Sequence, residues 1–139
     1  MDIGLAGSEP GRPSTTGPIV QFDSFENEGY YVFLHPWFAR LAEETGQYID
    51  LFGDAEFHGE ALRSLRQTVL DARRSVENQP AQWTVFIGTA TMPNAPDPPP
   101  PWDVIKGVDR SKLLALLHSL LAIVDRAIST GVGVVCFGD

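Results

Sequence analysis

The chain has 139 residues, 43% of them hydrophobic, and a formal net charge of −8 at pH 7. This length and apolar fraction are ordinary for one soluble domain with a core of its own. The negative charge disfavours non-specific binding to nucleic acid, because that binding requires lysine and arginine side chains to neutralise phosphates.

The beginning of the chain is rich in Gly, Pro, Ser and Thr and holds few large apolar residues. We therefore expect a flexible N-terminal arm over residues 1–18, followed by one α/β domain over residues 19–139. A short strand is predicted at residues 19–22. With Asp2 and Glu9, the start of the chain does not resemble a basic and apolar signal sequence.

The next segment contains β-favouring and turn-forming residues in alternation. Tyr, Val and Phe at 30–34 predict the first firm strand. Pro36 predicts the start of a short helix, and Gly46 predicts its end. Residues 47–52 then predict a second strand, which is followed by a Gly-Asp turn.

The second half alternates between helical and β patterns. Apolar residues recur at spacings of three and four from residue 60 to residue 78, which predicts a helix with its arginines in water. Residues 83–88 predict a central strand covered on both faces, and a proline-rich loop follows at 89–103. A long helix is predicted at 109–129 and a final buried strand at 132–137. We expect an α/β or α+β domain with a parallel or mixed sheet of four to five strands, two main helices and one short helix.

Charge is distributed unevenly along the chain. Residues 1–60 hold eleven acidic and two basic residues, whereas residues 61–139 hold seven acidic and eight basic residues. A one-sided acidic segment favours contact with something cationic, whether a basic protein, a metal or a basic ligand. The candidate partner-binding residues are Asp50, Asp54, Glu56, His58 and Glu60, together with Trp37.

Each of these residues also has a structural interpretation. Trp37 lies beside a proline, where an amphipathic ring can anchor an interface, although packing in the core is the favoured interpretation. The acidic segment could be a solvated loop in which Glu60 stabilises a helix N-terminus. It could also hold a divalent cation or supply a general acid and base, although it does not fit the pattern of a calcium loop.

No catalytic motif is found in the sequence, which lacks GxGxxG, a Walker loop, GxSxG and CxxC. Cys136 lies in the last predicted strand, where a small buried thiol is expected and an internal disulfide is impossible. The three histidines lack metal-binding spacing, and His118 is expected to be a partly buried structural residue. We therefore predict no enzyme activity, no catalytic residue, no metal and no cofactor, and a location in the cytoplasm.

Two segments resemble the barstar family of small acidic ribonuclease inhibitors. Residues 57–62 (FHGEAL) and Leu65 are similar to the loop and helix start that barstar-like inhibitors use on their target, and residues 127–137 are similar to their last helix, glycine and closing parallel strand. More broadly, the chain resembles the immunity proteins of bacterial polymorphic toxin systems. That resemblance implies that Asp54, Glu56 and Glu60 face a basic cleft of a toxin.

The leading hypothesis is an inhibitory binding protein, an immunity protein that neutralises a cognate bacterial toxin such as a basic nuclease through an acidic surface. The alternative is a small metal-dependent enzyme or metal-binding protein that uses the segment 50–60. A further alternative is a scaffold or dimerisation domain that uses the spare face of the long helix. The expected partner is a cognate toxin, with no nucleic acid and no membrane, and the chain is expected to be a monomer or weak homodimer.

Overall fold

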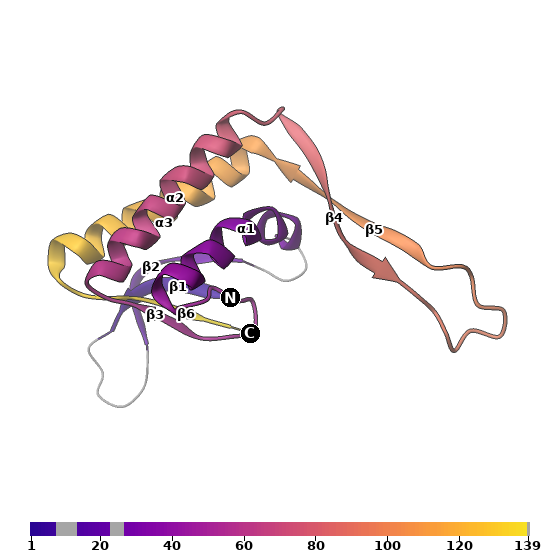
Figure 1. Cartoon of the computed structure of the whole chain (residues 1–139), viewed down its shortest axis with the longest axis horizontal. Coiled ribbons are helices and arrows are strands. Elements are labelled where there is room, and N and C mark those ends of the chain that lie inside the picture. The colour runs from indigo at the N-terminus through magenta and orange to yellow at the C-terminus, as the bar shows by residue number, and fades with distance from the viewer. Residues whose placement is uncertain (8–13, 23–26, 139) are drawn as a thin grey trace.

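The computed structural model describes residues 1–7, 14–22 and 27–138. Within them the chain forms an α+β fold with three helices, a four-stranded antiparallel sheet and a two-stranded antiparallel sheet. The helices lie on one face of the larger sheet, and the smaller sheet is a hairpin that extends away from this body (Figure 1).

The larger sheet joins strands from both ends of the chain. Its order is β2 (Thr15–Gln21), β1 (Asp2–Ala6), β6 (Val134–Phe137) and β3 (Ala55–Phe57), and each neighbouring pair is antiparallel. The predicted parallel or mixed sheet is therefore not confirmed. The prediction assumed that each helix crosses over between neighbouring strands, but the two middle strands of the chain leave this sheet and pair with each other. The antiparallel pairing of β6 also departs from the parallel closing strand that the barstar resemblance implies.

Four buried side chains form a row across the larger sheet, on the face that the helices cover. Val20, Ile3, Cys136 and Ala55 are paired in register across the four strands, and each is at most 5% exposed. The predicted flexible arm over 1–18 thus differs from the structure, which places β1 inside the sheet and starts β2 at Thr15. Residues 8–13 of that arm lie outside the described residues. The short run of apolar residues in β1 is enough to bury one face of a strand, because only alternate residues face the core.

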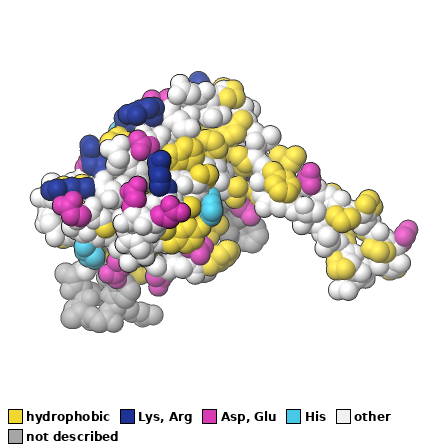
Figure 2. Space-filling view, in the orientation of Figure 1, with side chains coloured by type: hydrophobic (Ala, Val, Ile, Leu, Met, Phe, Trp, Pro, Cys, Tyr) yellow, Lys and Arg dark blue, Asp and Glu magenta, His cyan; other side chains and the backbone are white. Residues whose placement is uncertain are grey.

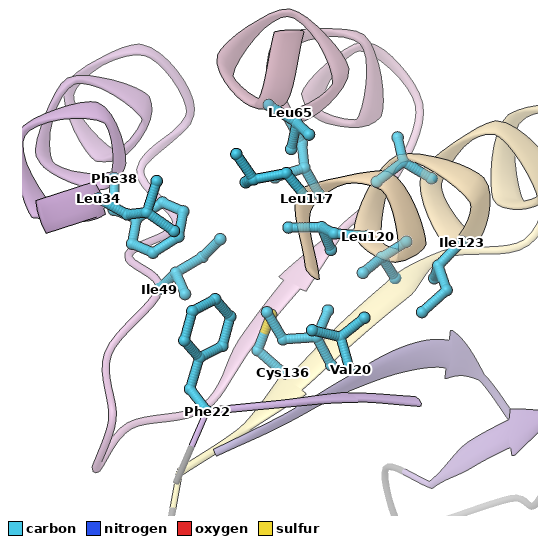
Figure 3. Packing of buried hydrophobic residues seen from close by; sticks show 14 of the residues in the cluster. Val20, Phe22, Leu34, Phe38, Ile49, Leu65, Leu117, Leu120, Ile123 and Cys136 are labelled. Carbon is cyan, nitrogen blue, oxygen red and sulfur yellow. The ribbon is translucent and has the colours of Figure 1, made fainter. Parts of the chain in front are cut away.

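Two of the helices begin and end close to where the sequence predicts. Helix α2 spans Glu60–Glu77, and helix α3 spans Arg110–Thr130. The side chain of Asp109 accepts a hydrogen bond from the backbone N–H of Lys112 at 3.0 Å, which satisfies one free donor at the start of α3. Both helices turn an apolar face to the core, where side chains from all three helices meet the sheet (Figure 3).

Helix α1 is the largest difference from the sequence prediction. It spans Glu28–Thr45, so that the predicted strand at 30–34 is helical and Pro36 lies inside the helix. The predicted short helix is therefore 18 residues long. Its buried residues Tyr31, Leu34, Phe38 and Leu41 recur at helical spacing and cover the core, and this burial overrides the β preference of the aromatic residues.

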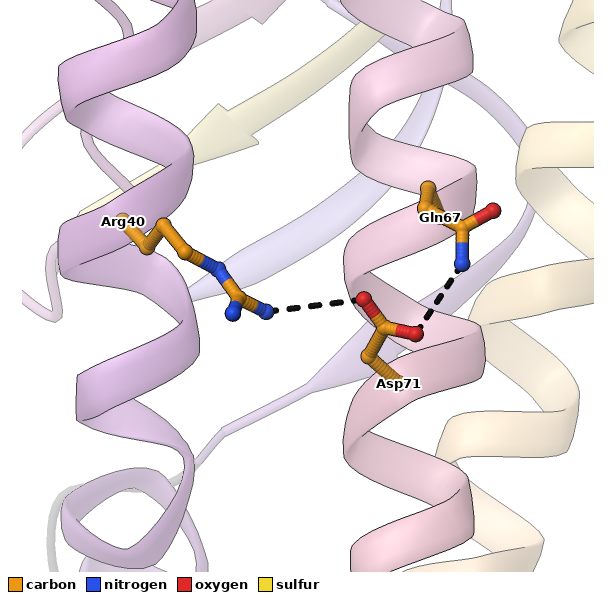
Figure 4. Close-up of polar contacts among 3 residues, drawn as sticks. All are labelled: Arg40, Gln67 and Asp71. Atoms are coloured by element: carbon orange, nitrogen blue, oxygen red, sulfur yellow. Dashed lines mark hydrogen bonds and ion pairs between the residues drawn. The ribbon is translucent and has the colours of Figure 1, made fainter.

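A polar contact joins α1 to α2 on the outside of the body. Asp71 accepts a hydrogen bond from Gln67 at 3.0 Å within α2 and pairs with Arg40 of α1 at 3.5 Å (Figure 4). Both partners of the ion pair are partly exposed, so we assign the contact a small stabilising role, about 0.5 kcal/mol or less. The association of the two helices therefore rests on their buried faces.

The segment after α1 and the hairpin correct two further strand predictions. Residues 47–52 pair with no strand in the part of the chain that the structure describes. Strands β4 (Gln82–Ala90) and β5 (Trp102–Asp109) pair only with each other in the described part of the chain, and most of their residues are exposed or half-exposed. The predicted central strand at 83–88 is thus wrong in its environment, since hydrophobic content alone does not distinguish a covered strand from an exposed one. The proline-rich connection runs from 91 to 101, slightly shorter than predicted.

Helix α3 is the one described helix that is long and apolar enough to span a membrane, with a mean hydropathy of 1.5. The core helices of soluble proteins meet the same criterion. Here six of its residues are buried, and it packs against α2 and the larger sheet. The predicted spare face is therefore reduced: Leu114, Leu116 and Leu121 are half-buried against the core, and Ile128 is its one strongly exposed large apolar residue.

Candidate partner-binding site

The connection between α1 and α2 holds most of the predicted site residues. Two tyrosine contacts attach it to α1: Tyr31 donates from its hydroxyl to the carbonyl of Ile49 at 3.0 Å, and the Tyr48 hydroxyl lies 2.6 Å from His35 Nε2. Ile49 and Leu51 are buried in the core. On either side of the buried Leu51, Asp50 is half-exposed and Phe52 is exposed.

Phe52 is the most exposed large apolar residue described, with 72% of its surface accessible. Asp50 precedes it and accepts a hydrogen bond from the Phe52 backbone N–H at 3.2 Å. Asp54 follows it and accepts one from the backbone N–H of Gly138 at 3.2 Å. Gly138 also packs directly against the backbone of Phe52, leaving no space for a side chain there. The loop is therefore held on both sides while its aromatic ring faces water. We call Asp50, Phe52, Asp54 and Glu56 the acidic loop.

The remaining acids and His58 form local pairs. Glu56 Oε2 lies 3.3 Å from His58 Nε2, and both side chains are more than half exposed. Glu60 pairs with Arg63 at 3.0 Å, one helical turn along α2. Glu60, at the end of the acidic segment 50–60, is therefore neutralised by a base that follows the segment in the sequence. Asp50, Asp54 and Glu56 have no Lys or Arg partner among the described ion pairs.

His58 lies where the end of β3 meets the start of β6. Its ring packs against Gly133, and any side chain at that position would collide with it. A hollow of about 270 Å³ lies beside it, and the end of α3 forms its other wall. Glu60 and Arg63 line this hollow with His58. Because the two side chains pair with each other, the lining of the hollow carries charges of both signs.

Trp37, the sixth predicted residue, belongs to another part of the molecule. Its ring lies 5.5 Å from that of Phe33, which in turn lies 5.0 Å from the ring of Trp83 at the base of the hairpin. Trp37 is half-buried against the core, as the favoured sequence interpretation holds. His118 differs from its prediction, since it is exposed on α3.

The geometry offers little for metal binding or catalysis. No group of three His, Cys, Asp or Glu side chains converges among the described residues. Burial, reinforced by the nearby charge of Asp54, raises the pKa of the Cys136 thiol to about 12. A thiol protonated at neutral pH is a poor nucleophile and a poor metal ligand. Burial likewise raises the pKa of Tyr31, and Tyr48 adds to the effect.

Sequence reasoning missed Phe52 and Tyr48 as parts of the surface. It interpreted 47–52 as a strand, and a strand normally buries one of its faces. The same alternation of apolar residues places Ile49 and Leu51 on one side and Tyr48 and Phe52 on the other. The signal for an exposed aromatic was therefore present, in the position of Phe52 directly before a Gly-Asp turn.

The chemistry of the acidic loop suits binding to a partner. It combines an exposed aromatic ring, three carboxylates without a Lys or Arg partner among the described ion pairs, and a backbone fixed by hydrogen bonds and buried neighbours. Comparison of the chain with family models, with curated proteins and with solved structures found no match.

Proposed function

We propose that this protein is an inhibitory binding protein, an immunity protein that neutralises a cognate bacterial toxin through the acidic loop. The observation that carries the proposal is Phe52, a large aromatic ring that is 72% exposed between two aspartates. Aromatic rings are enriched at protein–protein interfaces, and Phe52 is the most exposed large apolar residue among those described. The proposed site of action is the bacterial cytoplasm.

The two kinds of side chain have different roles in this proposal. Buried aromatic residues near the centre of an interface account for most of the affinity. Carboxylates around them raise the association rate with a basic surface and orient the partner. The acidic loop, with Phe52 flanked by Asp50 and Asp54, fits a partner that has an apolar pocket rimmed by Lys and Arg. The cleft of a basic nuclease is one surface of this kind.

The anchoring of the loop also supports tight binding. Association costs free energy when flexible groups become ordered, about 0.5–1.5 kcal/mol for each side chain with many rotamers. Here Tyr31, Asp54 and the buried Leu51 restrain the backbone before any partner arrives. Phenylalanine has only two side-chain torsions, so little further ordering is needed.

The proposal predicts a toxin domain encoded next to the gene of this protein. The test measures the binding kinetics of that domain by surface plasmon resonance at several salt concentrations. Phe52→Ala should raise the dissociation constant at least about 30-fold, mainly through faster dissociation. Phe86→Ala is the matched control, because Phe86 is also exposed, at 57%, but lies on the hairpin. Equal effects of the two substitutions would refute the assignment of the surface.

A second set of variants tests the electrostatic role. Lysine at Asp54, Glu56 and Glu60 should slow association about tenfold or more and flatten its salt dependence. The control set carries the same reversals at Glu43, Glu44 and Glu77. It changes the net charge equally and also breaks one ion pair, that of Glu77 with Arg73. If both sets slow association alike, the net charge of the chain acts and the acidic loop has no special role.

A further inference from the structure

The connection between β4 and β5 is longer and richer in proline than a hairpin requires. Strand β4 ends at Ala90 and β5 begins at Trp102, so the connection consists of residues 91–101, whereas about two to five residues usually close a hairpin. Six of these residues are prolines, and all of them except Ala95 are exposed. The connection therefore adds little to the core, and exposed loops on a rigid scaffold often carry function.

The hairpin holds this connection away from the body. At its base the ring of Phe33 lies 5.0 Å from that of Trp83, and the backbone N–H of Arg110 donates to the carbonyl of Ala81 at 3.0 Å. Beyond its base the hairpin projects from the helices and the larger sheet, with the connection at its far end (Figure 1). Figure 2 shows hydrophobic side chains, a class that there includes proline, on the projecting part. A partner can therefore reach the connection without meeting the helices.

Covalent geometry makes residues 98–101, which are all proline, an extended left-handed helix. The ring of each proline fixes φ at about −65°, and each residue from Asp97 to Pro100 precedes a proline, which disfavours the α-helical region. Every described peptide bond is trans, and these four residues belong to no α-helix, strand or turn. The resulting conformation is polyproline II, with three residues in each turn. Pro98 and Pro101 thus lie on the same edge of this helix, one turn apart.

A second pair of prolines with the same spacing is folded differently. Pro93 and Pro96 are also three positions apart, but the backbone N–H of Ala95 donates to the carbonyl of Met92 at 3.2 Å. This hydrogen bond closes a β-turn with Pro93 at its second position, a position that proline favours. The first half of the connection is therefore turned, and residues 98–101 form its extended part.

The chemistry of the extended part indicates which kind of groove can bind it. Its pyrrolidine rings are apolar and can pack on flat aromatic side chains, while its carbonyls are free to accept hydrogen bonds from Tyr or Trp. Little further ordering is needed, because the conformation exists before binding. Asp97 and Asp103 flank the prolines, are exposed, and belong to no described ion pair. Basic residues at the rim of the groove would complement them.

We propose that residues 98–101 are a docking segment for a partner domain whose groove is lined by Tyr and Trp and rimmed by Lys or Arg. Aromatic-lined grooves recognise proline-rich segments in SH3, WW and EVH1 domains. The hairpin keeps the segment clear of the body, so that such a groove can close around it. This proposal does not depend on the proposed function, because it uses neither the acidic loop nor a toxin.

The test titrates the full chain into a panel of purified SH3, WW and EVH1 domains that carry Lys or Arg beside their aromatic grooves. Calorimetry should show at least one domain that binds with a dissociation constant of about 100 µM or less. The double variant Pro98→Ala, Pro101→Ala should weaken this binding at least about tenfold. The matched control is Pro93→Ala, Pro96→Ala, which has the same spacing in the turned half and should change the dissociation constant less than about twofold.

Circular dichroism checks that both double variants are folded, and Pro101→Ala and Pro93→Ala replace any double variant that is not. Two results would overturn the proposal. If no domain of the panel binds the wild type at up to about 500 µM, residues 98–101 are only a connector. If both pairs of substitutions weaken binding equally, the domain does not recognise the extended part. Neither result bears on toxin binding by the acidic loop, which Phe52→Ala tests separately.

Discussion

Replacing Ile3 by alanine tests the central place of strand β1 in the sheet. Ile3 is fully buried between Val20 and Cys136 on the neighbouring strands. The substitution removes about three carbon groups, which at about 0.8 kcal/mol each lowers the free energy of unfolding by about 2.4 kcal/mol. The cavity left between two strands and α3 raises the cost to about 3 kcal/mol. If residues 1–18 were a flexible arm, the same change would have almost no effect.

Urea unfolding at 25 °C, followed by circular dichroism, measures this difference. With a slope of about 2 kcal/mol per molar, Ile3→Ala should lower the midpoint by about 1.5 M. Ile19→Ala, on the adjacent strand, is the matched control. Ile19 is 42% exposed, so Ile19→Ala should lower the midpoint by about 0.7 M. An Ile3→Ala midpoint within about 0.3 M of the wild type would refute the placement of β1.

Three further predictions concern single side chains. Because burial raises the pKa of Cys136 to about 12, its contribution to stability is present below the thiol's unfolded pKa and lost as the pH rises toward the folded value. Urea titrations at pH 9 and 10 should therefore show the wild type losing about 1 kcal/mol more than Cys136→Ala, and equal losses would contradict the burial. Asp109→Ala should lower the calorimetric melting temperature by about 3 °C, because it removes the cap of α3. Asp109→Asn can cap α3 in the same way and should change the melting temperature by less than about 1 °C. Equal shifts for the two variants would refute the cap. Trp83→Phe removes an indole Nε1 that is buried without a hydrogen-bond partner in the described structure. Removing this unpaired donor offsets the loss of ring volume, so the free energy of unfolding should stay within about 1 kcal/mol of the wild type. A loss above about 3 kcal/mol in urea unfolding would show that the Nε1 is hydrogen-bonded.

Helices α2 and α3 could be predicted because their signals are local. Both carry apolar residues at helical spacing over five turns or more, and α3 has a capping aspartate at one end and Gly131 at the other. Gly131 adopts φ of 70°, a conformation that favours glycine. No distant contact is needed to recognise such an element.

The misread elements depend on partners far away in the sequence. The aromatic residues at 30–34 favour strands in isolation, but the helical spacing of Tyr31, Leu34 and Phe38 buries them against the core. Residues 47–52 alternate as a strand does, yet none of the described strands pairs with them. In β1, burial comes from pairing with β6 at the other end of the chain. A single sequence contains no signal for these pairings.

The candidate site could be predicted in part. Its carboxylates are visible as a run of acids without bases, and the structure places them on one connection between α1 and α2. What the sequence could not show is which of them pair locally, as Glu60 does with Arg63, or that Phe52 points outward. Trp37 was grouped with the acids on the basis of its neighbouring proline, whereas its contacts lie with Phe33 near the hairpin.

The sheet order β2-β1-β6-β3 has a consequence for how the chain folds. Strand β6 follows every other described element in the sequence, and it contacts β1 on one side and β3 on the other. Until it arrives, β3 has no strand partner, and the row of side chains from Val20 to Ala55 lacks Cys136. During synthesis the three helices can form before β6 leaves the ribosome, and the sheet can close only afterwards. We therefore expect slow, late sheet closure, with the β1 edge exposed to wrong pairing in the interval.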